Sequence, residues 1–276
     1  MRVSMSSIDV QTLRHKVENI SALPTIPSTI KRIFSLIEKP SITLDEVSHF
    51  VGNDPALTLK VLKMVNSAIY GFPGRISSVS HAIMLLGLNV VKGLLLGVSV
   101  FEMMQTSMLG LWEHSTSCAV VARAIAKKKG SKEPDEVSVA ALLHDIGKVI
   151  LLLEFPQEYG AAIKDAKEKG LLISEAERLH FAEPHATVGK FLFEKWHFPA
   201  NLVEAVACHH RPQAAALAPL ETNIVHFSDI LVRARGFGFA GDDLLPALSP
   251  AAFEMLRLSE TDLREILSEL EASVSI

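Results

Sequence analysis

A histidine and an aspartate stand next to each other in a strongly apolar stretch of this sequence. His144 and Asp145 follow Ala141-Leu142-Leu143 and precede Ile146-Gly147. Burying an imidazole and a carboxylate costs roughly several kcal/mol unless the two groups are paired or bound to a metal ion. The pair therefore needs partners elsewhere in the fold.

Suitable partners lie on both sides of this pair, and together they form a nitrogen and oxygen ligand set for divalent metal ions. Helical bundles build such sites from inward-facing side chains on several helices. We expect Asp145 to bridge two ions. The first ion would be held by His114, His144, Asp145 and Asp229. The second would be held by Asp145, His185, His209 and His210.

Lys148 lies four residues after His144 and three after Asp145, so on a helix it would share their face. Its ammonium group could bind a substrate phosphate or pair with Asp145. Lys148 and Asp145 are therefore the candidate catalytic residues. His226, three residues before Asp229, is a further candidate, as a ligand or as a hydrogen-bonding partner of one.

Composition limits the class of protein. The 276 residues are 49% hydrophobic and 21% charged, as in a folded soluble chain. A net charge of −4 gives no footprint for general nucleic-acid binding. The most apolar run lies between Lys92 and Glu102, short of the roughly 18–20 residues that span a bilayer, so we expect no membrane span.

The start of the chain lacks the pattern of a secretion signal, and there are only two cysteines, Cys118 and Cys208. Two cysteines are too few for a disulfide framework and fit a reducing compartment. We expect both to be small core residues and the protein to be cytoplasmic.

The hydrophobic pattern predicts an all-α fold, because apolar residues recur at helical spacing and no alternating run competes. Thr43 with Glu46 predicts a capping box, and Asp54 before Pro55 predicts a helix start. The predicted helices cover residues 26–37, 55–66, 79–86, 90–104, 111–129, 135–153, 156–169, 174–180, 184–196, 201–209, 221–234 and 260–272.

All the candidate ligands follow a weak boundary near residues 104–110. We therefore expect an N-terminal helical lobe at 1–105, a metal-binding lobe at 106–235 and a C-terminal loop with helices at 236–276. The segment Gly236–Gly241 matches a dinucleotide fingerprint literally, but no strand precedes it, so we interpret it as a loop.

The order of His114, then His144-Asp145, then Asp229 resembles the HD superfamily of metal-dependent phosphohydrolases. The N-terminal half resembles the HDOD family, through four motifs in order: Leu23-Pro24-Thr25-Ile26-Pro27, Asn53-Asp54-Pro55-Ala56-Leu57, Val65-Asn66-Ser67-Ala68-Ile69-Tyr70-Gly71 and Ala82-Ile83-Met84-Leu85-Leu86-Gly87. The resemblance implies a multi-helix HD-type bundle and a bacterial signalling module.

The ligand set is similar to that of the HD-GYP phosphodiesterases, with Lys148 at the lysine of their HDxGK motif. The chain departs from that family after the histidine doublet, where it continues as Arg211-Pro212-Gln213-Ala214. Gly110 stands where some HD-GYP proteins carry a glutamate ligand, so two metal ions are expected rather than three.

Two functions follow from this resemblance. The first is a metal-binding HDOD signal-transduction or regulatory protein with an HD-type binuclear site. The alternative is an active phosphohydrolase or phosphodiesterase acting on a nucleotide or cyclic dinucleotide. The expected cofactors are two divalent transition metal ions, iron, manganese, nickel or zinc. The expected partner is a signalling protein or a phosphate-containing small molecule.

Overall fold

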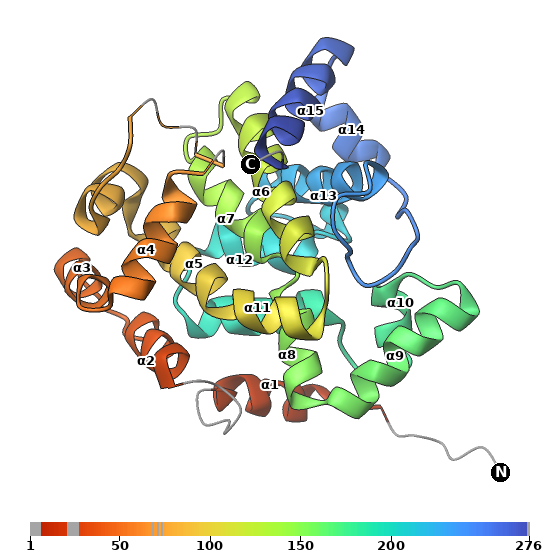
Figure 1. Ribbon diagram of the computed structural model, residues 1–276. Coiled ribbons are helices and arrows are strands. Elements are labelled where there is room, and N and C mark those ends of the chain that lie inside the picture. Colours follow the sequence, from red (N-terminus) through yellow and green to blue (C-terminus); the bar gives the residue numbers. More distant parts are fainter. Residues whose placement is uncertain (1–6, 21–27, 68, 71, 73, 275–276) are drawn as a thin grey trace.

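The computed structural model describes residues 7–20, 28–67, 69–70, 72 and 74–274, and its helices form a bundle (Figure 1). Within these residues the only β pairing is an isolated bridge between Ile8 and Phe181, so the all-α prediction is confirmed. The elements are α1 (Val10–Glu18), α2 (Ser28–Ile37), α3 (Leu44–Gly52), α4 (Pro55–Val65), α5 (Val79–Ser107), α6 (Leu111–Lys128), α7 (Pro134–Leu143), α8 (Ile146–Glu154), α9 (Pro156–Lys169), α10 (Ile173–Glu177), α11 (His185–Lys195), α12 (Ala200–Cys208), the 3₁₀ turn η2 (Pro212–Ala214), α13 (Pro219–Ala234), α14 (Pro250–Leu256) and α15 (Glu260–Val274).

The helix caps explain several of these boundaries. Thr43 and Glu46 form the predicted capping box of α3, and the Asp54 carboxylate accepts the Leu57 N–H at the start of α4. Gly87, with φ of 81°, interrupts α5 between the two stretches that periodicity predicts there. The first HDOD motif, residues 23–27, lies outside the described residues, as do positions 68 and 71 of the third.

The predicted single helix over residues 135–153 is wrong at its centre. The chain forms α7 and α8, and His144 and Asp145 occupy the turn between them. The apolar pattern runs through this turn without a glycine or proline, so periodicity could not reveal it. The break leaves both polar side chains at the ends of two buried helices.

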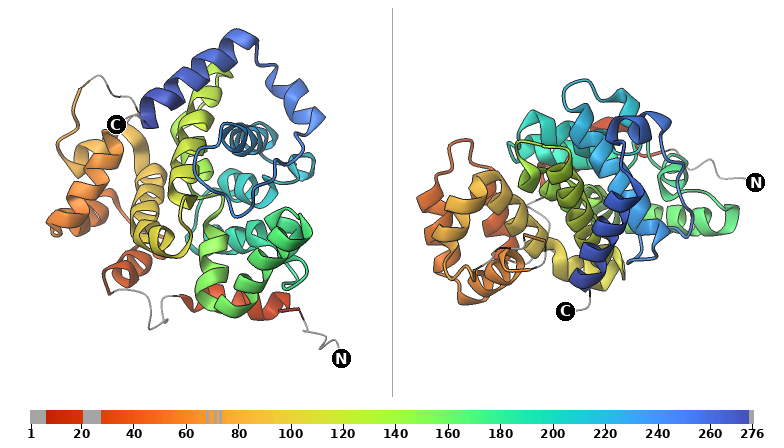
Figure 2. Two further views of the ribbon diagram at one scale, coloured as in Figure 1. Left: turned by 45° about the vertical axis from the view of Figure 1, so that its right-hand side comes forward. Right: turned by 90° about the horizontal axis from the view of Figure 1, so that it is seen from above.

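The helices pack around one continuous hydrophobic core, which extends from Leu13 in α1 to Leu270 in α15. In Figures 1 and 2, α2–α4 lie on one side of α5, and the helices that follow lie on its other side. α5 contacts both groups, and α1 packs against α11. The proposed division at residues 105 and 235 stays a prediction.

One helix segment, Val79–Val100, is long and apolar enough to cross a membrane by length and composition alone. Its most apolar window is 72% buried inside the fold. The segment also carries Lys92, whose Nζ donates a 2.7 Å hydrogen bond to the Trp196 carbonyl in the core. These contacts are those of a central helix in a globular bundle.

Candidate metal centre

Asp145 lies at the centre of the predicted ligand set, with its two carboxylate oxygens directed at different histidines. Oδ1 is 3.2 Å from His185 Nε2 and 3.9 Å from His209 Nε2. Oδ2 is 3.3 Å from His144 Nε2 and 3.8 Å from His114 Nε2. One carboxylate therefore joins residues from α6, the α7–α8 turn, α11 and the end of α12.

The potential metal ligands gather in two groups, each with donor atoms within 4.8 Å of one another. The first group is His114, Cys118, His144 and Asp229, and the second is Asp145, His185, His209 and His210. All seven predicted ligands thus come together. Compared with the predicted division, Cys118 joins the first group, while Asp145 belongs to the second and reaches the first through Oδ2.

Two of the histidines are held in the same way at the C-terminal ends of their helices. His144 Nδ1 bonds to the Ala141 carbonyl at 2.6 Å, and His209 Nδ1 bonds to the Val206 carbonyl at 2.7 Å. Each imidazole therefore uses a helix-end carbonyl that lacks a partner within the helix. Because Nδ1 is the donor in these bonds, Nε2 is left as an electron-pair donor toward the centre.

A buried carboxylate holds the third histidine. Glu177 Oε2 accepts both the backbone N–H of His185, at 2.9 Å, and its Nδ1–H, at 2.7 Å. The other oxygen, Oε1, accepts the Tyr159 hydroxyl at 3.2 Å. Gly147 permits the close approach of α8 to this segment, because a Cβ there would lie 2.0 Å from the His185 carbonyl oxygen.

Four buried polar atoms at the centre have no hydrogen-bond partner among the described residues: His144 Nε2, His209 Nε2, Asp145 Oδ1 and Asp229 Oδ1. Unpaired buried polar atoms are rare and costly in folded proteins. All four are electron-pair donors in the arrangement described above, so a cation in each ligand group would satisfy the two atoms that belong to it. The donor set fits divalent transition metal ions.

The electrostatics keep Asp145, His209 and His210 in ligand form. Burial opposes ionisation of Asp145, but the charges of His144 and Lys148 hold its pKa well below the usual range. Burial and the neighbouring imidazoles lower the pKa of His209 and His210 well below the usual value, so both rings are neutral. Neutral imidazoles beside ionised carboxylates are the forms that bind metal ions. Burial alone would lower the pKa of His144 and His185, but the nearby carboxylates of Asp145 and Glu177 give both a net rise, so a metal ion bound there would displace a proton.

Lys148 is fully enclosed at the base of the site. Its Nζ donates to Asp145 Oδ2 at 2.6 Å and to the Ala240 carbonyl at 2.7 Å, and the residue is 1% exposed. Of the two interpretations open from the sequence, pairing with Asp145 is the contact observed. The carbonyl partner comes from the Gly236–Gly241 segment, which is a loop as predicted.

Gly238 lets this loop pack closely against α6. A Cβ on Gly238 would lie 2.3 Å from the His114 backbone nitrogen and 2.4 Å from the Gly110 carbonyl oxygen. The Phe239 N–H donates to that same carbonyl at 2.9 Å. The loop is therefore pressed against the first turn of α6, next to His114.

His226 is not placed as a ligand. Its Nδ1 donates to the His209 carbonyl at 2.7 Å, and its Nε2 accepts the Ser249 N–H at 3.1 Å. Both ring nitrogens are used, so His226 supports the backbone of His209.

Sequence reasoning missed two groups at the site. Cys118 is buried as predicted, but its sulfur lies 3.6 Å from His114 Nε2, whereas Cys208 is only half-buried. Glu177 was not singled out, although a carboxylate 0% exposed in the fold must have partners. Its only signal in the sequence is its position eight residues before His185.

Comparison with known proteins agrees with this fold. The HDOD domain profile matches residues 23–212, and the chain belongs to the HDOD domain family. A crystal structure of an HDOD domain protein with unknown function from Geobacter sulfurreducens has 26% sequence identity and a TM-score of 0.67, covering 97% of this chain and 96% of that one.

Two further matches are a structure with lower sequence identity and a protein longer than this chain. A candidate phosphohydrolase from Shewanella amazonensis SB2B shares the fold, with 20% identity, a TM-score of 0.59 and coverage of 92% of this chain and 97% of that one. An uncharacterized protein of Treponema pallidum (strain Nichols) is 25% identical over 82% of this chain. The match covers 46% of that relative, so this chain spans less than half of its length.

Proposed function

We propose that this chain is a metal-binding signal-transduction or regulatory protein of the HDOD family, with an HD-type site for two divalent transition metal ions. The observation that carries the proposal is the position of Asp145. Its two oxygens face His144 and His185, which belong to different ligand groups, at 3.3 Å and 3.2 Å. A short carboxylate in this position suits a bridge between two ions.

The remaining residues would divide between the ions. His114, His144 and Asp229 would hold the first ion, together with Asp145. His185, His209 and His210 would hold the second, also with Asp145. Lys148 offsets the charge of Asp145, and Glu177 orients His185. Bound metal ions would supply Lewis acidity and a lowered pKa for a coordinated water.

Burial favours regulation over hydrolysis. His114, His144, His185 and His209 are 0% exposed, and His210 is the donor of the two groups that is only partly buried. A hydrolase must admit a phosphate to its metal ions, and here the 236–241 loop packs against Lys148 and the His114 backbone and adds to their enclosure. A metal enclosed in this way instead stabilises one packing of the helices around it.

The alternative, a phosphohydrolase acting on a nucleotide or cyclic dinucleotide, is favoured by one feature. Two ligand groups joined by a carboxylate match the two-metal arrangement that clamps phosphate oxygens. In that case Lys148 would have to leave the Ala240 carbonyl to reach a phosphate.

Because the metal ligands are enclosed, a regulatory partner would act from outside the metal centre. We propose that this partner is a signalling protein or a phosphate-containing small molecule.

Turnover and conformational response separate the two functions. Protein loaded with Mn²⁺ or Fe²⁺ is incubated with bis(p-nitrophenyl) phosphate, mononucleotides and cyclic di-GMP, beside Asp145→Ala. We expect retained metal with no hydrolysis above the variant. We also expect metal removal to raise amide exchange in α6 and α13, beyond the ligands themselves. Hydrolysis that disappears in Asp145→Ala would establish the enzyme, and exchange unchanged by metal would refute a regulatory role.

A further inference from the structure

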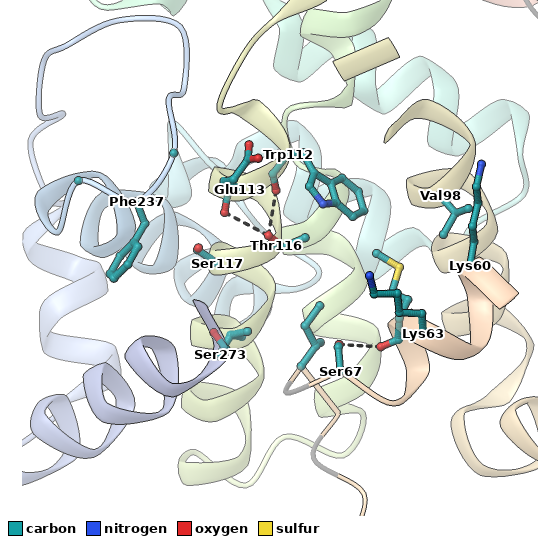
Figure 3. Close-up of a pocket in the computed structure, with 15 residues that line it drawn as sticks. Lys60, Lys63, Ser67, Val98, Trp112, Glu113, Thr116, Ser117, Phe237 and Ser273 are labelled. Atoms are coloured by element: carbon teal, nitrogen blue, oxygen red, sulfur yellow. Dashed lines mark hydrogen bonds between the residues drawn. The ribbon is translucent and has the colours of Figure 1, made fainter. Parts of the chain in front are cut away.

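A cleft lies on the opposite face of α6 from the candidate metal ligands. The cleft has a volume of about 700 Å³ and is bounded by α4, α5, α6, the start of the 236–241 loop and the end of α15 (Figure 3). This volume falls within the roughly 300–1,000 Å³ of small-molecule sites. Neither group of metal ligands lines it. The cleft is therefore separate from the predicted metal site.

The walls of the cleft combine aromatic, cationic and hydroxyl groups. Trp112 and Phe237 supply rings, and in the view of Figure 3 Trp112 lies between Phe237 and the α4 lysines. Those lysines are Lys60 and Lys63, whose side chains are exposed at one wall. Aromatic faces bind planar rings, and ammonium groups bind phosphate as point charges.

Two polar groups at the α6 wall lie between Phe237 and Trp112 in the view of Figure 3, and they suit a sugar. Ser117 is 3% exposed and lines the cleft. Glu113 lines the same wall from an exposed position. A serine hydroxyl can donate a hydrogen bond to a ligand oxygen or accept one from it, and a carboxylate accepts hydrogen bonds from ligand hydroxyls.

We propose that this cleft binds a nucleoside monophosphate, with its base against Phe237, its sugar at Ser117 and Glu113, and its phosphate past Trp112 at Lys60 and Lys63. The separation of the lysines from Glu113 by Trp112 keeps the phosphate away from the carboxylate. The positive charge of the two lysines favours a ligand with an anionic group over a purely apolar one. The binding claim stands independently of the proposed metal function.

The position of the cleft gives such a ligand a route to the metal centre. α6 presents Trp112 and Ser117 to the cleft and His114 and Cys118 to the metal ligands. Gly238 also lines the cleft while lying against the His114 backbone. If the proposed function holds, the nucleotide is its input signal, because it contacts the helix and loop that hold the metal ligands.

The two tryptophans allow a direct binding experiment. Trp112 lines the cleft, whereas Trp196 is 0% exposed and packs against Phe34. Titration with GMP should quench Trp112 fluorescence saturably, guanosine should bind at least tenfold more weakly, and inorganic phosphate should leave the emission unchanged. Trp112→Phe should remove the quenching, and calorimetry measures the binding that remains.

Variants locate the bound nucleotide. The double variant Lys60→Gln/Lys63→Gln should weaken GMP at least tenfold and leave guanosine unchanged, whereas Lys164→Gln on the exposed face of α9 should do nothing. His144→Ala should retain GMP binding. No saturable GMP binding would overturn the proposal, as would binding lost in His144→Ala but kept in the lysine variant. Metal content measured on the same samples tests the proposed function separately.

Discussion

Replacing Glu177 with glutamine should weaken the binding of the second metal ion and leave the binding of the first unchanged. Glu177 Oε2 accepts two bonds from His185, and Oε1 accepts one from Tyr159. A glutamine amide oxygen can take the place of Oε2, and its nitrogen can donate to the Tyr159 oxygen. The substitution therefore preserves the geometry and removes the charge.

The size of the effect follows from that charge. Burial lowers the pKa of His185, but the charge of Glu177 is a main cause of its net rise. Charge-assisted hydrogen bonds are about twice as strong as neutral ones, and partners of metal-bound histidines contribute roughly 10–100-fold to metal affinity. Because both bonds to His185 are kept, we expect the lower end, about tenfold, or about 1.4 kcal/mol.

A chelator competition assay measures the two ions separately. Glu183→Gln is the matched control, since Glu183 lies two residues from His185 and, within the described part of the chain, accepts a side-chain hydrogen bond from Thr187 alone. The control should retain both affinities. Two ions bound by Glu177→Gln as tightly as by the wild type would refute the orienting role of this carboxylate. An equal loss of affinity for both ions would instead indicate a general loss of packing around the site.

Three further predictions concern stability. Gly238→Ala should lower the free energy of unfolding by at least about 2 kcal/mol, because its Cβ would meet the His114 backbone nitrogen at 2.3 Å. Gly236→Ala, which has open space around it, should lower it by only about 1 kcal/mol, and denaturant unfolding curves compare the two variants. Burial lowers the pKa of Lys92 to about 8, below its value in the unfolded chain. The charged ammonium group therefore lowers the free energy of unfolding below pH 8, and this loss of stability fades as the pH rises from 8 to about 10. Lys92→Met should therefore be more stable than wild type by about 1–2 kcal/mol at pH 7, a figure that already subtracts the lost hydrogen bond to the Trp196 carbonyl. This gain in stability should vanish near pH 10, and a gain independent of pH would contradict the reasoning. Removing metal with a chelator should lower the unfolding free energy by about 4 kcal/mol relative to protein held at a thousandfold excess of metal over Kd, and identical melts would argue against binding to the folded state.

The metal-ligand candidates were predictable because their residue types are costly to bury. His144 and Asp145 in an apolar stretch demand partners wherever the chain places them, and the structure gathers the expected ones. The break between α7 and α8 was not predictable, because the side-chain pattern is equally apolar on both sides of it. The turn depends on tertiary contacts, including the approach of Gly147 to α11.

Sequence reasoning missed two residues of the site for the same reason, because their roles depend on tertiary contacts. Cys118 lies one turn after His114, where a cysteine is indistinguishable by pattern from a small apolar core residue. Glu177 ends the short helix α10, and only the packing of that helix brings it to His185. The role of Gly238 depends equally on a contact between distant segments. Spacing along one helix predicts neighbours on that helix, but contacts between helices require the fold.

The most direct test of this account is the metal content of the purified protein, measured by elemental analysis and native mass spectrometry after incubation with Fe²⁺, Mn²⁺, Ni²⁺ or Zn²⁺. We predict two ions per chain in the wild type, one in His209→Gln and one in Asp229→Asn, because these variants alter different ligand groups. Asp145→Asn, with circular dichroism to confirm folding, should lose at least one ion and weaken the other. A folded wild type that takes up none of these metals would contradict the binuclear site.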